Sequence, residues 1–216
     1  MNLEQRLQYL QEIVAREFYR VGVVQFGAFK LRHHQNEPDA PLSPIYINLR
    51  NLRAAPGALD AVVIMFRALI DEICSQYGLF DLLADVPTAV TPIVAVLMDR
   101  SRIPMITPRN DRKEHGSGND IDGLFQSGQK VLLIDDVLVR GQSCLRAIKI
   151  LEDRQLKVED VLVVVDREQG GAQELIKSGR RVHSVIKLST LMAFYLKWNY
   201  IDVKRYEEVI SYLRGS

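Results

Sequence analysis

Two adjacent carboxylates, Asp135 and Asp136, directly follow the apolar run 131–134. The segment 139–143 comes next, with Gly141 at its centre, and the sequence then favours a helix. A loop that opens onto a helix N-terminus directs backbone N–H groups and the positive end of the helix dipole at one place, which suits a phosphate group. Carboxylates one ribose length away from that phosphate can accept hydrogen bonds from sugar hydroxyls. The alternative interpretation is an acidic turn that only caps the helix.

The composition limits the classes of protein to which the chain can belong. The chain has 216 residues, of which 47% are hydrophobic and 25% charged, as in a globular protein of one domain. Lys and Arg number 28 against 27 for Asp and Glu, so no overall field favours nucleic acid or an anionic membrane, and an anion site must be local. The sequence has no run of about 18 apolar residues, so no membrane span is predicted. Cys74 and Cys144 have no metal-type spacing and are predicted to be reduced thiols of a cytoplasmic protein.

The elements that must position these carboxylates can be predicted from hydrophobic periodicity. Residues 3–20 favour a helix, and 21–30 and 43–50 favour extended segments that form a small N-terminal lobe. From residue 56 onward helices and strands alternate, which predicts an α/β fold with a central, mainly parallel sheet. The predicted helices are 57–77, 91–100, 144–152 and 172–177, and the predicted strands are 82–86, 104–107, 130–134, 158–165 and 182–188. Ligands bind at the carboxyl ends of such strands, where Asp135 and Asp136 are expected.

The strand, Asp-Asp-Val and glycine loop together resemble the phosphoribosyl-diphosphate signature of type I phosphoribosyltransferases. Four further segments are similar to the orotate branch of that family: FGAFKL (26–31), SPIYINLR (43–50), RNDRKEHG (109–116) and DREQGG (166–171). The resemblance covers nearly the whole chain, and DREQGG beside the Asp-Asp signature is specific. It implies the type I fold, as one domain of residues 1–216 with an N-terminal hood in 1–55 and a phosphoribosyl-diphosphate-binding core in 56–216.

The resemblance also implies a reaction. Orotate displaces diphosphate from phosphoribosyl diphosphate, with Mg²⁺ as cofactor, and orotidine 5′-phosphate is formed in the synthesis of UMP. The family works as a homodimer, in which the mobile loop of one subunit reaches the site of its neighbour. No nucleic acid or membrane partner is implied.

The catalytic roles that the resemblance implies fall on five residues. Asp135 and Asp136 would bind the ribose hydroxyls and stabilise the oxocarbenium charge. Lys113 would neutralise the departing diphosphate, with Arg109 and His115 assisting from the same loop. The alternative for that loop is a solvated run of charges.

The remaining implied contacts bind the substrates. Arg167 would face the carboxylate or ring carbonyls of orotate, and its alternative is a surface ion pair with a neighbouring carboxylate, Asp166 or Glu168. Arg32 stands where the hood of the family has a lysine. The loop expected to hold the 5′-phosphate consists of Val139, Arg140, Gly141, Gln142 and Ser143.

Several departures from the family pattern fall on this site. Val139 and Gln142 stand where the family has threonines, Asn110 stands where the catalytic loop has a second lysine, and the diphosphate loop, residues 88–90, lacks a lysine. All of these changes weaken anion binding, although Arg140, Gln142 and Ser143 offer other donors. They favour, as the main alternative to the enzyme, a non-catalytic relative that binds phosphoribosyl diphosphate or a nucleotide as a regulator or partner subunit. A purine phosphoribosyltransferase and a DNA-binding regulator are less well supported, because of DREQGG and the lack of a basic face.

Overall fold

The computed structural model describes residues 2–31, 39–109 and 120–215. Its centre is a six-stranded sheet with the strand order β5-β4-β3-β6-β7-β8. All neighbouring strands are parallel except β5, which pairs antiparallel with β4. The strands are β3 (Leu82–Asp85), β4 (Met105–Pro108), β5 (Ile121–Asp122), β6 (Lys130–Leu138), β7 (Lys157–Asp166) and β8 (Arg181–Lys187). The predicted α/β class with a mainly parallel sheet is confirmed.

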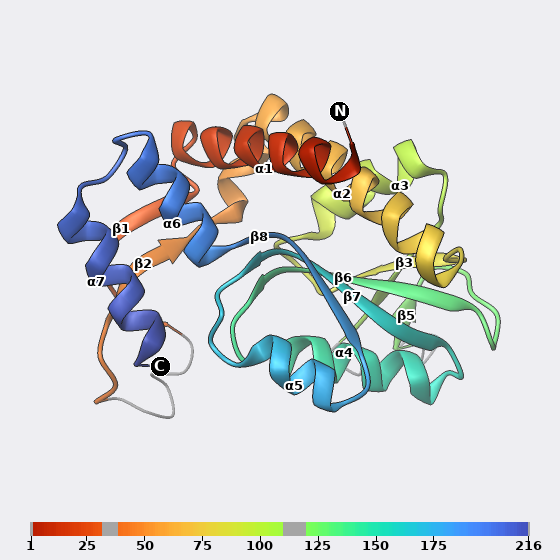
Figure 1. Cartoon of the computed structure of the whole chain (residues 1–216). Helices are drawn as coiled ribbons and strands as arrows, with labels where there is room; N and C mark the ends of the chain where they lie inside the picture. Colours follow the sequence, from red (N-terminus) through yellow and green to blue (C-terminus); the bar gives the residue numbers. More distant parts are fainter. Residues whose placement is uncertain (1, 32–38, 110–119, 216) are drawn as a thin grey trace.

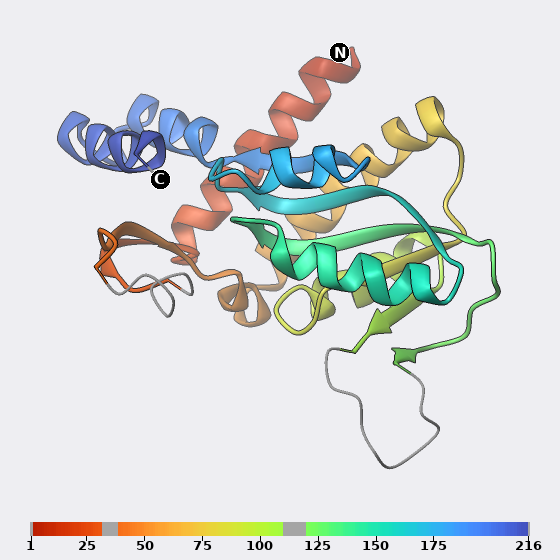
Figure 2. The same ribbon diagram turned by 90° about the horizontal axis from the view of Figure 1, so that it is seen from below.

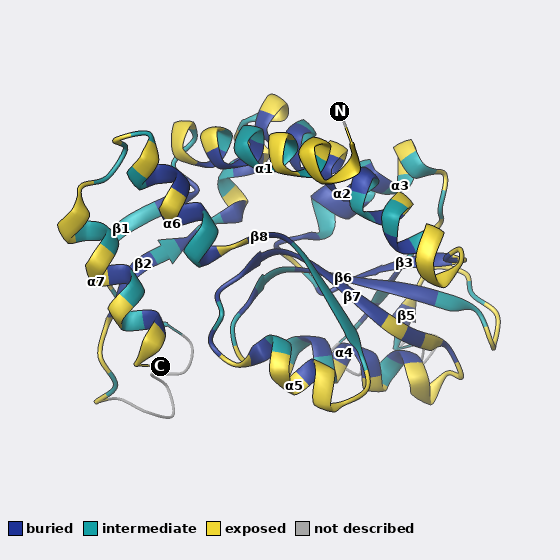
Figure 3. Cartoon of the chain, in the orientation of Figure 1, coloured by how far each residue is buried: buried dark blue, intermediate teal, exposed yellow. Residues whose placement is uncertain are grey.

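Helices cover both faces of this sheet (Figure 1). α2 (Pro56–Tyr77) and α3 (Thr91–Ser101) lie on one face, and α4 (Gln142–Asp153) and α5 (Gly171–Lys177) lie on the other (Figure 1). Side chains along β6 alternate between the two faces of the sheet. Leu132 and Ile134 join the hydrophobic cluster on the first face, and Val131 and Leu133 join the cluster on the second. This is why the strand has an uninterrupted apolar sequence. Figure 3 shows its buried residues between helices whose outer sides are exposed.

A second unit packs beside the sheet. β1 (Val24–Phe29) and β2 (Ser43–Ile47) form an antiparallel pair, and η2 (Leu49–Ala54) is a 3-10 helix that leads into α2. α1 (Leu3–Arg20) packs along α2. Figure 2 shows the β1–β2 pair to one side of the main sheet. We keep the word hood for this β1–β2 pair and η2.

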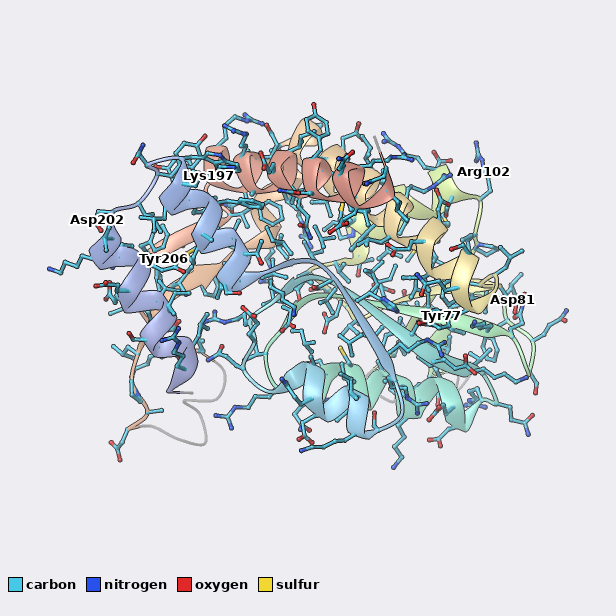
Figure 4. All side chains as sticks on the ribbon, in the orientation of Figure 1. Tyr77, Asp81, Arg102, Lys197, Asp202 and Tyr206 are labelled. Carbon is cyan, nitrogen blue, oxygen red and sulfur yellow. The ribbon has the colours of Figure 1, made fainter. Side chains whose placement is uncertain are left out.

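The C-terminal segment was not predicted as helical and forms two helices. α6 (Leu188–Lys197) packs against α1, and α7 (Val203–Arg214) packs against β2 of the hood. Figure 4 labels Tyr206 on α7, which packs against the main hydrophobic cluster, and Lys197 at the end of α6. The division of the chain at residue 55 stays a proposal, since α7 from the far end of the chain also covers the hood.

Two predicted boundaries beside the site differ from the structure. The strand predicted for 130–134 continues to Leu138, because β7 has ten residues and offers backbone partners as far as Asp166. Asp135 and Asp136 therefore lie within β6 and not in a loop beyond it. The extended segment predicted for 43–50 ends at Ile47, before η2.

Within the described ranges, no helix combines the length and the apolar character needed to cross a membrane.

Candidate active site

The two carboxylates at the end of β6 have different surroundings. Asp135 is 5% exposed, whereas Asp136 is only half-buried. One Asp135 oxygen accepts the backbone N–H of Asp136 at 2.8 Å, and the other accepts the Cys144 thiol at 3.2 Å. Burial first, and then the neighbouring charge of Asp136, raise the pKa of Asp135 well above its usual value. Asp136 is therefore the more accessible carboxylate, and Cys144, to which sequence reasoning gave no role, contacts the other.

The predicted phosphate loop lies at the N-terminus of α4. Gly141 has a φ of 74° and precedes Gln142, the first residue of the helix, and no described side chain caps this end. The backbone N–H groups in the first turn of α4 have no acceptor within the helix, and such groups can bind a phosphate. Arg140 and Gln142 are exposed, while Val139 and Ser143 are half-buried. The loop is thus formed mainly by backbone.

The segment DREQGG packs directly against this loop. The N–H of Gly171 donates to the carbonyl of Val139 at 2.9 Å, and the N–H of Arg167 donates to the carbonyl of Leu138 at 2.9 Å. A Cβ atom at Gly171 would lie 2.6 Å from the Val139 oxygen, and one at Gly141 would lie 3.2 Å from the Gly171 oxygen. Only glycine allows such an approach. The two segments, taken from the sequence as separate signals, form one backbone-to-backbone contact.

Arg167 is 2% exposed and joins the hood to the core. Its Nε donates to Gln169 Oε1 at 2.8 Å, its Nη2 donates to Ser43 Oγ at 3.0 Å, and its Nη1 contacts the Ile45 carbonyl at 3.4 Å. All three acceptors are uncharged. The alternative of a surface ion pair is wrong, because the side chain is buried and neither neighbouring carboxylate pairs with it. Burial lowers the pKa of Arg167.

A count of donors shows what this guanidinium can still bind. Arginine has five N–H bonds, one on Nε and two on each terminal nitrogen. Three of them are used by the contacts to Gln169, Ser43 and Ile45. One N–H therefore remains on each terminal nitrogen. The Ser43 and Ile45 oxygens lie 2.7 Å apart, so they occupy the two parallel N–H bonds between Nη1 and Nη2, and the two that remain lie on opposite flanks of the guanidinium.

The end of β3 contributes a group that sequence reasoning missed. Asp85 is fully buried, and the hydroxyls of Thr91 and Thr107 each donate to one of its carboxylate oxygens. Thr91 begins α3 and Thr107 lies on β4, so the carboxylate joins the ends of two strands to the helix beside them. The sequence signal that could have identified Asp85 is a carboxylate at the end of an apolar strand.

The predicted diphosphate loop, which follows β3, receives a cation from the hood. Nη2 of Arg53, which lies on η2, donates to the Thr88 carbonyl at 3.0 Å. Arg53 thus lies beside the loop in which sequence reasoning found a lysine missing. Arg53 and Thr88 are 35 residues apart in the sequence, so no local pattern indicated this contact.

Of the segment that resembles the catalytic loop, residues 109–116, the structure describes only Arg109. Arg109 donates its backbone N–H to the Asp120 carbonyl at 2.8 Å, and its Nε pairs with Asp122 at 2.9 Å. The described residues on either side of 110–119 thus meet at β4 and β5. Lys113, His115 and Arg32 lie outside the described residues, so their predicted roles stay predictions.

Comparisons with known proteins give the family. An orotate phosphoribosyltransferase of Pyrobaculum islandicum is 35% identical over 198 residues, which are 91% of this chain and 96% of that protein. The uridine 5′-monophosphate synthase of Bos taurus is 31% identical over 196 residues, which are 91% of this chain but 39% of that protein. The chain therefore spans about two-fifths of the length of such a synthase.

A solved structure agrees with the sequence relatives. The UMP synthase of Leishmania donovani matches with a TM-score of 0.81 and 28% identity, covering 95% of this chain and 42% of that one. No family model matches the sequence. At 35% identity over nearly the full length of the Pyrobaculum enzyme, the chain belongs to the orotate phosphoribosyltransferase family.

Proposed function

We propose that this chain transfers the 5-phosphoribosyl group from phosphoribosyl diphosphate to orotate, giving orotidine 5′-phosphate and diphosphate. The observation that carries the proposal is Arg167, a buried cation that is bonded only to uncharged acceptors among the described residues. Burying a cation without an anionic partner is costly. The carboxylate of orotate supplies that partner and accepts a hydrogen bond from one of the spare N–H bonds of the guanidinium.

The 5′-phosphate binds at the N-terminus of α4 in this proposal. The backbone N–H groups that follow Gly141 and the helix dipole attract it, and Arg140 and Ser143 add donors. Gln142 and Val139 supply no hydroxyl. A hydrogen bond to a charged group contributes roughly 1.5–3 kcal/mol, so one arginine offsets much of that loss.

Asp136 and Asp135 act on the ribose. The half-buried Asp136 accepts hydrogen bonds from the ribose hydroxyls, and the buried Asp135 contributes its charge from behind. Negative charge at this place stabilises the positive charge that develops on the ribose as diphosphate leaves. Lys113, with Arg109 and His115, balances the charge of the leaving diphosphate.

The donor set also fits Mg²⁺. No group of three or more His, Cys, Asp or Glu side chains among the described residues forms a metal cage. Mg²⁺ keeps several waters and is usually bound through one or two carboxylates together with substrate phosphates, so Asp136 and the diphosphate oxygens fit it. The ion, when bound, neutralises charge on the diphosphate.

A homodimer is part of the same proposal. Arg109 and the segment after it resemble a loop that acts across a subunit interface, and sedimentation at micromolar concentration tests this. A monomer alone would contradict it. A cytoplasmic location also stays a prediction.

The alternative function is a non-catalytic relative that binds phosphoribosyl diphosphate. Val139 and Gln142, where the family has threonines, are the observation that favours it. The deciding experiment incubates the purified chain with Mg²⁺, phosphoribosyl diphosphate and a panel of bases, and follows base consumption. We expect orotate to be consumed and Lys113→Ala to lower turnover by orders of magnitude with the melting temperature unchanged. Binding without turnover would favour the alternative, and unaltered turnover in the variant would remove Lys113 from the mechanism.

A further inference from the structure

The predicted diphosphate loop, residues 86–90, is packed into the protein except at its tip. Its buried residues are Val86, Ala89 and Val90. The Thr91 hydroxyl donates to the carboxylate of Asp85, so a hydrogen bond closes the loop at its base. Thr88, in contrast, is exposed. The loop therefore has a fixed shape, and its tip is the part that a ligand can reach.

Arg53 of the hood is held at this tip. It lies on η2, and its Nη2 donates to the Thr88 carbonyl at 3.0 Å. The Arg53 side chain is otherwise exposed, and no carboxylate of the described ranges pairs with it. A guanidinium has five N–H bonds, so most of them remain for a ligand.

The charge of Arg53 is the feature that the loop itself lacks. Residues 85–91 contain neither lysine nor arginine. A diphosphate carries several negative charges, and sites that release one compensate those charges with cations. The partner of Arg53 is an uncharged carbonyl, which fixes the guanidinium without neutralising it. The positive charge at the loop tip therefore stays available for an anion.

We propose that Arg53 is a diphosphate-binding residue, and that the hood supplies from η2 the positive charge that residues 86–90 lack. The Thr88 carbonyl holds the guanidinium in place, and its other N–H bonds donate to diphosphate oxygens. The inference rests on the proposed function in one respect, since it takes residues 86–90 as the loop that binds the diphosphate of the substrate.

Two substitutions separate the charge of Arg53 from its contact with the loop. Arg53→Gln keeps an amide N–H donor and removes the charge, whereas Arg53→Lys keeps the charge. Calorimetric titration with phosphoribosyl diphosphate, and with diphosphate alone, measures both variants in the presence of Mg²⁺. We expect Arg53→Gln to weaken both ligands about tenfold, as for the loss of a hydrogen bond between charged groups, and Arg53→Lys to stay within about threefold of wild type. The loss in Arg53→Gln should shrink as salt is added, because salt screens an exposed charge.

Two controls confine the effect to the diphosphate. Ribose 5-phosphate has no diphosphate and should bind equally to wild type and to Arg53→Gln. Arg67→Ala removes another guanidinium that donates to a distant backbone carbonyl, that of Arg100 near the end of α3, and it should change none of these affinities. The melting temperature of each variant should match that of wild type, since Arg53 is exposed.

Three results would overturn the inference. They are diphosphate binding in Arg53→Gln as tight as in wild type, an Arg53→Lys that binds as weakly as Arg53→Gln, and a wild-type protein that binds no diphosphate. A wild-type protein that binds diphosphate through Arg53 but consumes no orotate would refute the proposed function alone.

Discussion

The proposed base side and the proposed phosphate side of the site are built by different means. On the base side, Arg167, Gln169 and Ser43 are all buried and are bonded to one another through their side chains. On the phosphate side, Arg140 and Gln142 are exposed, and the loop is positioned by backbone contacts and by the start of α4. A backbone site keeps its donors when side chains change, whereas a network of buried side chains loses them. This difference makes the phosphate side the more tolerant of departures from the family pattern, such as Val139 and Gln142.

The largest effect is expected where a buried side chain cannot be replaced. Arg167→Leu removes the buried cation and its hydrogen bond to the base, and at roughly 1.5–3 kcal/mol for a bond between charged groups the loss in kcat/KM for orotate should be about 10-fold to 100-fold. Arg180→Leu, which removes a guanidinium that pairs with Glu152, should leave kinetics unchanged. A loss of less than about threefold in Arg167→Leu would mean that the base side is as tolerant as the phosphate side.

A smaller effect is expected from the exposed arginine of the phosphate loop. Arg140→Ala should weaken phosphoribosyl-diphosphate binding by more than tenfold, about 1.4 kcal/mol, because its charge offsets the missing threonine hydroxyls. The double variant Val139→Thr with Gln142→Thr should strengthen binding or raise turnover. Calorimetric titration measures all three proteins. If Arg140→Ala binds as tightly as wild type, backbone alone holds the phosphate.

The contact between Gly171 and Val139 tests whether the two sides are independent. A Cβ at Gly171 would lie 2.6 Å from the Val139 oxygen, so Gly171→Ala must shift the phosphate loop although the residue belongs to the base-side segment. We expect phosphoribosyl-diphosphate binding to weaken about tenfold in calorimetry. Gly57→Ala, whose Cβ would meet nothing within 4 Å, is the control. Unchanged binding in Gly171→Ala would show that the loops move separately.

The smallest effect concerns stability and comes from the buried carboxylate of Asp135. Burial raises the pKa of Asp135 above its unfolded value of 3.8, so the folded state holds its proton more tightly than the unfolded state. As pH rises from about 4 through that raised pKa, wild-type stability should fall, and the advantage of Asp135→Asn should grow. Urea unfolding at a series of pH values measures the difference. A difference that stays constant with pH contradicts the prediction.

Asp160 provides the control with the opposite sign. Burial opposes its ionisation, but hydrogen bonds from Arg181 and His183 lower its pKa to about 2. Its contribution to stability is therefore present above pH 3.8 and lost as pH falls through about 2. Asp160→Asn should lose stability relative to wild type above that window and approach wild type below it.

Local patterns predicted most of the fold. Residues 3–20 form the predicted helix, and the predicted strand 130–134 is part of β6, between β3 and β7. Prediction ended at residue 188, so α6 and α7 were missed, although apolar residues such as Leu191 and Phe194 lie at helical spacing there. The strand β6 was predicted too short because its last residues depend on the length of its partner β7, which is not a local property.

At the site, contacts between residues that are distant in sequence limited what could be predicted. The types and spacing of Asp135, Asp136 and Gly141 could be recognised within one segment. Ser43 and Arg167 are 124 residues apart, and the hydroxyl of a serine in a strand gives no sign of its partner. Likewise the pair of glycines in DREQGG could be recognised, but not the carbonyl of Val139 that requires the second of them.

The spare N–H bonds of Arg167 have a consequence for inhibitor chemistry. They lie on opposite flanks of the guanidinium, so a ligand group meets one donor at a time and needs one acceptor there. A carboxylate or a carbonyl oxygen satisfies this. An ammonium group can only donate, so it would leave the N–H unsatisfied in a buried place, at about 1–3 kcal/mol, and would add a second positive charge beside the first.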